Sequence, residues 1–181
     1  MYIEQVKGEL LDKMMTNDGQ SLFRATFDQP VMLVFLRHFA CVFCREAMTE
    51  LAARKTEIDN AGTKLIFVHM ATHEIAEEYF EEFNLTGVSH ISDPSSEFYR
   101  AFGLGKGTFR QLFGLSTWIR GYDIVVNKNI PVKAANASLG DSFQMPGVFI
   151  LQAGAVKEAY IHKLASDRPD YEKLMECCII R

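Results

Sequence analysis

Two cysteines separated by two residues, Cys41 and Cys44, are the side chains of this sequence best suited to chemistry. They lie between an apolar run at residues 31–36 and a helical pattern that continues from Cys44. In the first turn of a helix, unpaired N–H groups and partial positive charge favour a thiolate over a thiol. We therefore predict reversible thiol–disulfide chemistry, with Cys41 as the attacking thiol and Cys44 as the resolving thiol.

A helix start alone does not make the thiolate of Cys41 dominant. An ordinary cysteine is only a few per cent ionised at neutral pH, and reversing that balance requires about 2 kcal/mol. A helix terminus typically supplies about 0.3–1 kcal/mol. A further donor is needed, and Arg37, His38 and Arg45 are the nearest candidates. We select His38, three residues before Cys41, to hydrogen-bond the thiolate or to transfer its proton.

Two other interpretations of the cysteine pair are open. Free cysteines are often small buried hydrophobic residues without chemistry. A Cys-x-x-Cys pair can also hold zinc, with Cys177, Cys178 or a histidine completing a tetrahedron. The chain has no second Cys-x-x-Cys pair, so we expect no metal, and we expect no cofactor because sulfur itself carries the electrons. Cys177 and Cys178 are assigned to the last helix, with Cys178 on its buried face and no catalytic role for either.

Composition restricts the class of protein. The chain has 181 residues, of which 48% are hydrophobic, and this size predicts a single domain over residues 1–181. Its net charge of −4 argues against nucleic acid as a partner. No apolar run approaches the roughly 18 residues that a membrane span needs, and the first residues do not resemble a leader, so we expect a cytoplasmic protein without a membrane partner.

Apolar periodicity predicts an α/β chain. Amphipathic helices are expected at residues 3–15, from Cys44 to about 59, at 73–83, at 95–102 and at 170–179. Buried strands are expected at 31–36 and 64–70, a short strand at 88–91, and an antiparallel hairpin at 147–151 and 156–162. The first two strands and the helix between them form a right-handed βαβ unit. Residues 1–29 form an N-terminal helical extension, whose helix either covers its own core or pairs with a second copy of the chain in a homodimer.

Residues 103–143 form a long connection, predicted to be a flap or insertion. The segment is rich in glycine and aromatic residues at first and polar afterwards. A connection of this length is usually a lid or a covering loop. We expect helix around Thr108 to Ile119, and a pocket over Cys41 shaped by Phe109, Phe113 and Trp118.

This order of elements resembles a thioredoxin-like fold, a central mixed β-sheet flanked by helices. The segments Phe35-Leu36-Arg37-His38, Cys41-x-x-Cys44-Arg45, Ser92-Asp93-Pro94 and Phe102-Gly103 make the chain similar to the peroxiredoxin-like family of the alkyl hydroperoxide reductase/thiol-specific antioxidant (AhpC/TSA) type. The resemblance also implies that Pro146, just before a core strand, is a cis-proline. The backbone of Met145 would then pair with a substrate chain, so Met145 and Pro146 are predicted substrate-binding residues.

The resemblance implies a thiol–disulfide oxidoreductase or peroxiredoxin-like antioxidant that uses Cys41 and Cys44. One alternative is a thiol peroxidase with Cys41 as the peroxidatic cysteine. Another is a non-catalytic thioredoxin-fold module that binds a partner or holds zinc. The expected partners are a protein or low-molecular-weight disulfide, or a hydroperoxide, together with a reducing thiol donor.

Overall fold

A five-stranded mixed sheet forms the centre of the computed structural model, which describes residues 6, 8–128, 130, 134 and 136–176. The strands are β1 (Val31–Phe35), β2 (Lys64–His69), β3 (Ser89–Ser92), β4 (Gly147–Gln152) and β5 (Ala155–Ile161). The helices are α1 (Gly8–Lys13), α2 (Leu22–Asp28), α3 (Val42–Ala53), α4 (Lys55–Asn60), α5 (His73–Glu82), α6 (Glu97–Ala101), α7 (Phe109–Phe113), α8 (Leu115–Asn127) and α9 (Tyr171–Glu176), with a short 3₁₀ turn at Ala137–Leu139.

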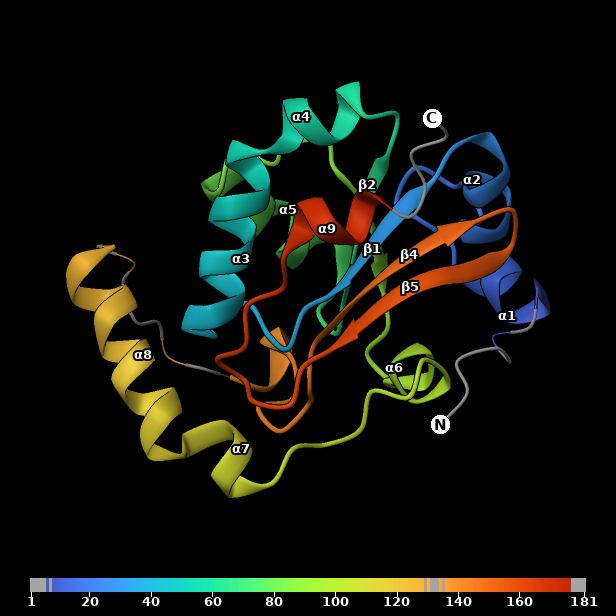
Figure 1. Ribbon diagram of the computed structural model, residues 1–181. Coiled ribbons are helices and arrows are strands. Elements are labelled where there is room, and N and C mark those ends of the chain that lie inside the picture. Colours follow the sequence, from blue (N-terminus) through green and yellow to red (C-terminus); the bar gives the residue numbers. More distant parts are fainter. Residues whose placement is uncertain (1–5, 7, 129, 131–133, 135, 177–181) are drawn as a thin grey trace.

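The strand order β3-β2-β1-β4-β5 confirms the predicted α/β class and the thioredoxin-like architecture. β1 pairs in parallel with β2, and β2 with β3. β4 runs antiparallel to β1 and to β5, which forms the predicted hairpin. The three parallel strands therefore all end at the same edge of the sheet, where Cys41 and the start of α3 follow β1 (Figure 1).

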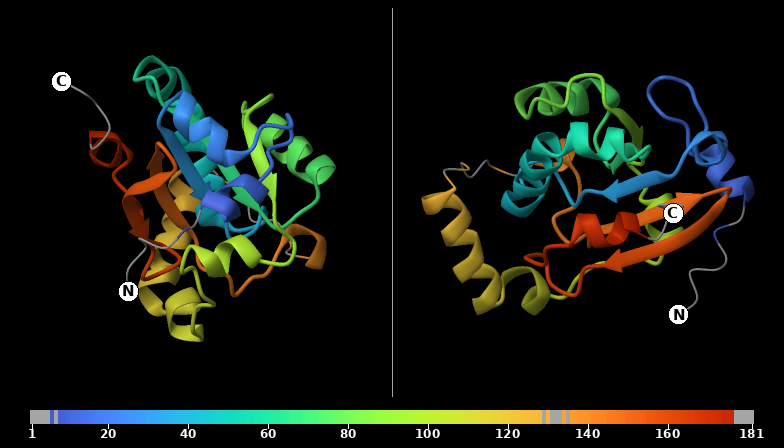
Figure 2. Two further views of the ribbon diagram at one scale, coloured as in Figure 1. Left: turned by 90° about the vertical axis from the view of Figure 1, so that its right-hand side faces the viewer. Right: turned by 45° about the horizontal axis from the view of Figure 1, so that its top comes forward.

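Alternate side chains of β1 enter two separate hydrophobic layers because successive residues of a strand point to opposite faces. Met32 and Val34 belong to the layer beneath α3, α4, α5 and α9. Leu33 and Phe35 belong to the layer that α1, α2 and α6 cover. Every residue of β1 is buried, as the uninterrupted apolar run predicts. Figure 2 shows helices on both faces of the sheet.

Several helix boundaries differ from those predicted. The first helix begins at Gly8, and α2 was not predicted; it starts where Ser21 accepts a hydrogen bond from the Arg24 amide. The helix that follows Cys41 divides at Arg54 into α3 and α4. The last helix has the predicted buried face, but Cys177 and Cys178 lie outside the described residues.

The connection at residues 103–143 is more helical than predicted. α7 and α8 together extend the predicted helix to Asn127, and Figure 2 shows them as an arm beside α3. Among the described residues, no helix is both long and apolar enough to cross a membrane. The single domain over residues 1–181, its extension at 1–29 and the flap at 103–143 stay predictions.

Candidate active site

Cys41 and Cys44 lie at the start of α3 as free thiols. Cys41 occupies the N-cap position, and its carbonyl accepts a hydrogen bond from the Arg45 amide. Cys44 lies in the first helical turn. Both side chains are nearly buried, with exposed fractions of 5% and 4%.

Arg37 contacts both sulfur atoms through different atoms. Its backbone N–H donates to Cys44 Sγ at 3.2 Å, and its Nη1 donates to Cys41 Sγ at 3.5 Å. The guanidinium is held in place from the flap, because Nε and Nη2 both donate to the Ser142 carbonyl. Arg37 is buried, so its charge acts on the sulfur with little screening by water.

These contacts differentiate the two thiols. The hydrogen bond from the Cys44 side chain, together with the nearby charges of Arg37 and His38, lowers the pKa of Cys41 well below its usual range, although burial opposes the change. The same hydrogen bond and burial raise the pKa of Cys44. Cys41 is thus the more acidic thiol of the pair, and Cys44 the less acidic. A nucleophile and its resolving partner require such a difference.

The three candidate donors to Cys41 have different positions. His38 lies at the same cavity as Cys41, but its Nδ1 is buried without a hydrogen-bond partner among the described residues. Burial lowers the pKa of His38. Arg45 points away from the sulfur, since it pairs with Glu82 at 2.9 Å and stacks over Phe83, so it is not the donor. Sequence spacing favoured His38, whereas the guanidinium at the sulfur belongs to Arg37.

A cavity of about 470 Å³ opens over Cys41 between α3 and the α7–α8 arm. Its walls are mainly apolar, and Arg37, His38 and Cys41 form its polar end. Phe113 and Trp118 line it, as predicted, but Phe109 does not. The remaining lining residues are Val42, Phe43, Leu112, Thr117, Gly121, Tyr122 and Val125. The cavity can therefore hold an apolar molecule with a reactive polar group directed toward the sulfur.

A buried carboxylate fixes α8 above this cavity. Glu46 of α3 accepts hydrogen bonds from Arg120 Nη2 at 2.7 Å and from Lys128 Nζ at 2.5 Å. Arg120 lies in α8, and Lys128 directly follows it. The Glu46 side chain of α3 therefore holds the α7–α8 arm at two points. The position of the cavity roof thus depends on α3 itself.

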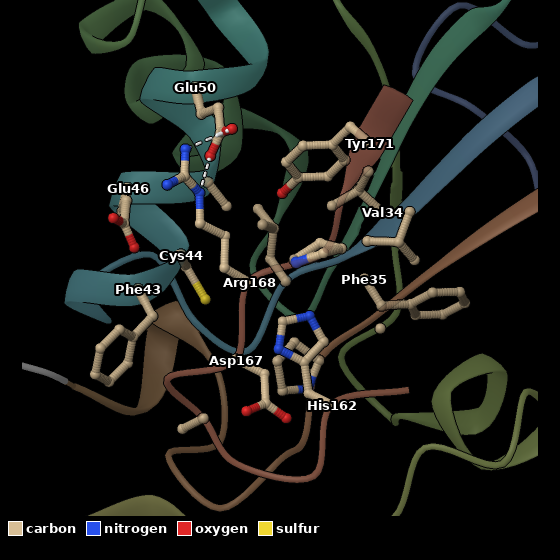
Figure 3. Close-up of a pocket in the computed structure, with 17 residues that line it drawn as sticks. Val34, Phe35, Phe43, Cys44, Glu46, Glu50, His162, Asp167, Arg168 and Tyr171 are labelled. Carbon is tan, nitrogen blue, oxygen red and sulfur yellow. Dashed lines mark hydrogen bonds and ion pairs between the residues drawn. The ribbon is translucent and has the colours of Figure 1, made fainter. Parts of the chain in front are cut away.

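A second, much smaller cavity of about 30 Å³ lies behind Cys44, with room for one or two water molecules (Figure 3). Cys44, Tyr171 and His162 are among its walls. Burial lowers the pKa of His162 to about 4. Arg168 closes the rim through two hydrogen bonds to Glu50, at 2.9 and 2.8 Å. The cavity is too small for a substrate larger than water or peroxide.

The prediction that Pro146 follows a cis peptide bond is wrong. The described residues contain no cis peptide bond, so the bond before Pro146 is trans. The Met145 N–H already donates to the Gly105 carbonyl at 3.1 Å, so it is not available to pair with a substrate chain. Pro146 lines the small cavity behind Cys44, and Met145 packs against Leu112. Substrate contact by Met145 and Pro146 stays a prediction.

Two features hold the loop that carries Arg37 and His38. The buried Tyr99 hydroxyl donates to the Leu36 and Val68 carbonyls, at 2.5 and 3.0 Å, and so joins the ends of β1 and β2. On the flap side, Gly140 has a φ of +123°, and a Cβ there would lie 3.1 Å from the Arg37 carbonyl oxygen. Only glycine lets the flap approach this closely, which brings Ser142 to the guanidinium.

Comparisons with known proteins place this geometry in context. The profile of a family described as AhpC/TSA antioxidant enzyme matches residues 50–165, a stretch that begins after both cysteines. A thioredoxin-like protein, AAED1, from Arabidopsis thaliana is 25% identical over 159 residues, covering 83% of this chain and 62% of that protein. Peroxiredoxin-like 2C from mouse is 29% identical over 141 residues, covering 74% and 60%.

The chain thus spans about three fifths of the length of these two relatives. The plant protein is named chloroplastic, and the cytoplasmic location expected for this chain stays a prediction. Among solved structures, peroxidoxin BcpB from Mycobacterium tuberculosis superposes with a TM-score of 0.61 at 12% identity, covering 91% of this chain and 89% of that one. Peroxiredoxin Q from Xanthomonas campestris gives 0.60 at 17% identity, covering 89% and 88%. These similarities are at the level of the fold.

Proposed function

This chain belongs to the AhpC/TSA antioxidant enzyme family, and from that membership we propose that it is a thiol-dependent reductase of apolar hydroperoxides. The family supports a peroxiredoxin-like redox function in general. One observation carries the narrower proposal: the Cys41 sulfur lies at the polar end of an apolar cavity of about 470 Å³, with Arg37 Nη1 3.5 Å away.

In the proposed reaction, the Cys41 thiolate attacks the outer oxygen of a hydroperoxide, ROOH. The O–O bond breaks, Cys41 becomes a sulfenic acid, and the leaving RO⁻ takes up a proton to give the alcohol ROH. The Arg37 guanidinium stabilises both the thiolate and the negative charge on the leaving oxygen. His38, the other polar group at this end of the cavity, relays the proton from solvent.

The Cys44 thiol then attacks the Cys41 sulfur, which forms the disulfide and releases water. An external dithiol returns the pair to two thiols and is itself oxidised to a disulfide. Each cycle therefore moves two electrons from the dithiol to the hydroperoxide. Met145 and Pro146 assist by packing against the cavity wall at Leu112 and by closing the space behind Cys44.

The geometry favours this reaction over the reduction of protein disulfides. Cys41 is only 5% exposed, and the backbone N–H of Met145 is occupied. A polypeptide substrate would need both groups to be accessible, whereas a small apolar hydroperoxide needs only the cavity.

The test is consumption of cumene hydroperoxide with dithiothreitol as the reductant. Cys41→Ser is expected to abolish consumption. Without dithiothreitol, Cys44→Ser is expected to consume one equivalent of peroxide and to accumulate a Cys41 sulfenic acid that dimedone captures. Wild-type protein should also prefer cumene hydroperoxide to hydrogen peroxide, because the cavity walls are apolar.

Two outcomes would refute the proposal. The first is equal peroxide consumption by wild type and Cys41→Ser. The second is a Cys41 that dimedone never labels in Cys44→Ser after peroxide treatment. Reduction of a protein disulfide that depends on Cys41, without peroxide consumption, would instead favour the oxidoreductase.

A further inference from the structure

Three histidines converge at the edge of the sheet where the parallel strands end, apart from the cysteine pair. His69 is the last residue of β2, His90 lies in the neighbouring β3, and His73 begins α5. Their facing ring nitrogens all lie within 4.8 Å of one another. His69 and His90 are each only 1% exposed, and His73 is half-buried.

The facing nitrogens have mainly each other as partners. His90 Nδ1 lies 2.8 Å from His69 Nε2 and 3.3 Å from His73 Nδ1. The outward nitrogens, His69 Nδ1 and His90 Nε2, are buried without a hydrogen bond to any described residue. A neutral imidazole carries one N–H and one lone pair, so with the N–H on these outward nitrogens the facing nitrogens present lone pairs that can bind a cation.

We propose that His69, His73 and His90 bind a divalent transition-metal ion, Zn²⁺, through His69 Nε2, His73 Nδ1 and His90 Nδ1. Zn–N bonds of about 2.0–2.1 Å in a tetrahedron separate two ligand nitrogens by about 3.3 Å. The His73–His90 separation already has this value, and the His69–His90 separation needs to open by about half an ångström. Three imidazoles leave the fourth position for water, which enters on the side of half-buried His73.

The surroundings of the cluster fit such a site. Glu77 lies one helical turn after His73, and its Oε1 is 4.0 Å from His90 Nε2, the nitrogen that faces away from the ion. Histidines that bind metals commonly donate this other N–H to a carboxylate, which fixes the ring. Phe80 packs against the His69 and His90 rings, with ring centroids 6.1 and 5.1 Å apart, and so limits their movement.

The sequence contained a signal for this site that our prediction of no metal overlooked. His69 and His73 are four residues apart, and His90 belongs to the next strand of the parallel sheet. The zinc interpretation considered at the sequence level rested on Cys41 and Cys44 instead. The two proposals therefore use separate residues and can fail separately.

The experiment uses the full chain after metal removal by a chelator. Zn²⁺ is titrated against a chromophoric competitor, and Co²⁺ serves as a spectroscopic probe, since thiolate ligands give intense charge-transfer absorption and imidazoles do not. We expect one Zn²⁺ per chain and a Co²⁺ spectrum without thiolate absorption. His73→Gln should weaken binding by more than about 100-fold, and Glu77→Gln by much less, because Glu77 is exposed and its Oε1 lies 4.0 Å from His90 Nε2.

His73 is only half-buried, so its replacement is less damaging to the core than that of His69 or His90, and circular dichroism checks the fold. His162→Gln is the matched control, because it removes a half-buried histidine that follows β5, at the opposite edge of the sheet from β3, and should bind as wild type does. Absence of Zn²⁺ binding overturns the proposal. So does binding that His73→Gln leaves unchanged, or a thiolate band in the Co²⁺ spectrum.

Discussion

Replacing Arg37 by methionine removes the cation in contact with the Cys41 sulfur, and we expect it to weaken the ionisation of that thiol. The variant keeps the backbone N–H that donates to Cys44 Sγ and a side chain of similar length. It therefore removes the guanidinium while preserving the other hydrogen bonds of the cysteine pair.

The magnitude follows from the geometry. Two unit charges 3.5 Å apart, the Arg37 Nη1 to Cys41 Sγ distance, attract by about 1 kcal/mol in water and about 5 kcal/mol at an effective dielectric constant of about 20. A hydrogen bond to a charged group contributes about 1.5–3 kcal/mol, within that interval. Since about 1.4 kcal/mol is a factor of ten, the ionisation constant of Cys41 should fall between about tenfold and 150-fold.

The assay is the rate of Cys41 alkylation by iodoacetamide as a function of pH. Peptide mass mapping assigns the label, because Cys44, Cys177 and Cys178 are further cysteines of the chain. In Arg37→Met the rise in alkylation rate should move to higher pH, and in Arg37→Lys it should move less, because lysine keeps the charge.

Arg110→Met is the matched control, since it removes one positive charge from an exposed position on α7. Urea unfolding shows that each variant is folded, which matters because Arg37 also holds the Ser142 carbonyl. An Arg37→Met profile that overlays the wild type would refute the reasoning. A shift of equal size in Arg110→Met would mean that net charge, and not the contact, sets the acidity of Cys41.

Three further variants test other parts of the structure. His38→Asn should slow hydroperoxide turnover and move the Cys41 alkylation profile less than Arg37→Met does; an equal shift would make His38 the main donor. His162 has its pKa lowered by burial from 6.5 to about 4, so the unfolded chain binds a proton below pH 6.5 that the native chain binds only below about 4. The contribution of neutral His162 to the unfolding free energy is therefore lost as pH falls from 6.5 to about 4. At pH 4, His162→Gln should lose about 3 kcal/mol less unfolding free energy than the wild type does. Parallel plots of unfolding free energy against pH for the two proteins would contradict this. Asp93→Ala removes the carboxylate that accepts hydrogen bonds from the Glu97 and Phe98 amides, at 2.9 and 2.8 Å, at the start of α6. It should lower the free energy of unfolding in urea by about 1–2 kcal/mol. A loss below about 0.3 kcal/mol would show that α6 does not depend on this carboxylate.

The parts of the fold that could be predicted are those with strong local patterns. Uninterrupted apolar runs of strand length, rich in β-branched and aromatic residues, identified β1 and β2 as strands buried on both faces. Short helices such as α2 carry few periodic positions, so composition did not separate α2 from a loop. α8 extends past its predicted end because Glu46 holds Arg120 and Lys128, and pairing of this kind is invisible along the chain.

The site was predictable in its residues more than in their contacts. The position of Cys41 and Cys44 at a helix start followed from the order of strand, spacing and helix. The choice of His38 over Arg37 used distance along the sequence, which does not give the direction of a side chain in a loop. The cis geometry of Pro146 came from family resemblance, and the local backbone does not adopt it.

Arg37 serves the two sulfur atoms through chemically distinct groups. Every amino acid except proline supplies a backbone N–H, so nearly any replacement at position 37 would still anchor Cys44. The donor to Cys41 exists only while the side chain is arginine. Substitutions at this one position could therefore change the reactivity of Cys41 over a wide range while the hydrogen bond to Cys44 is kept.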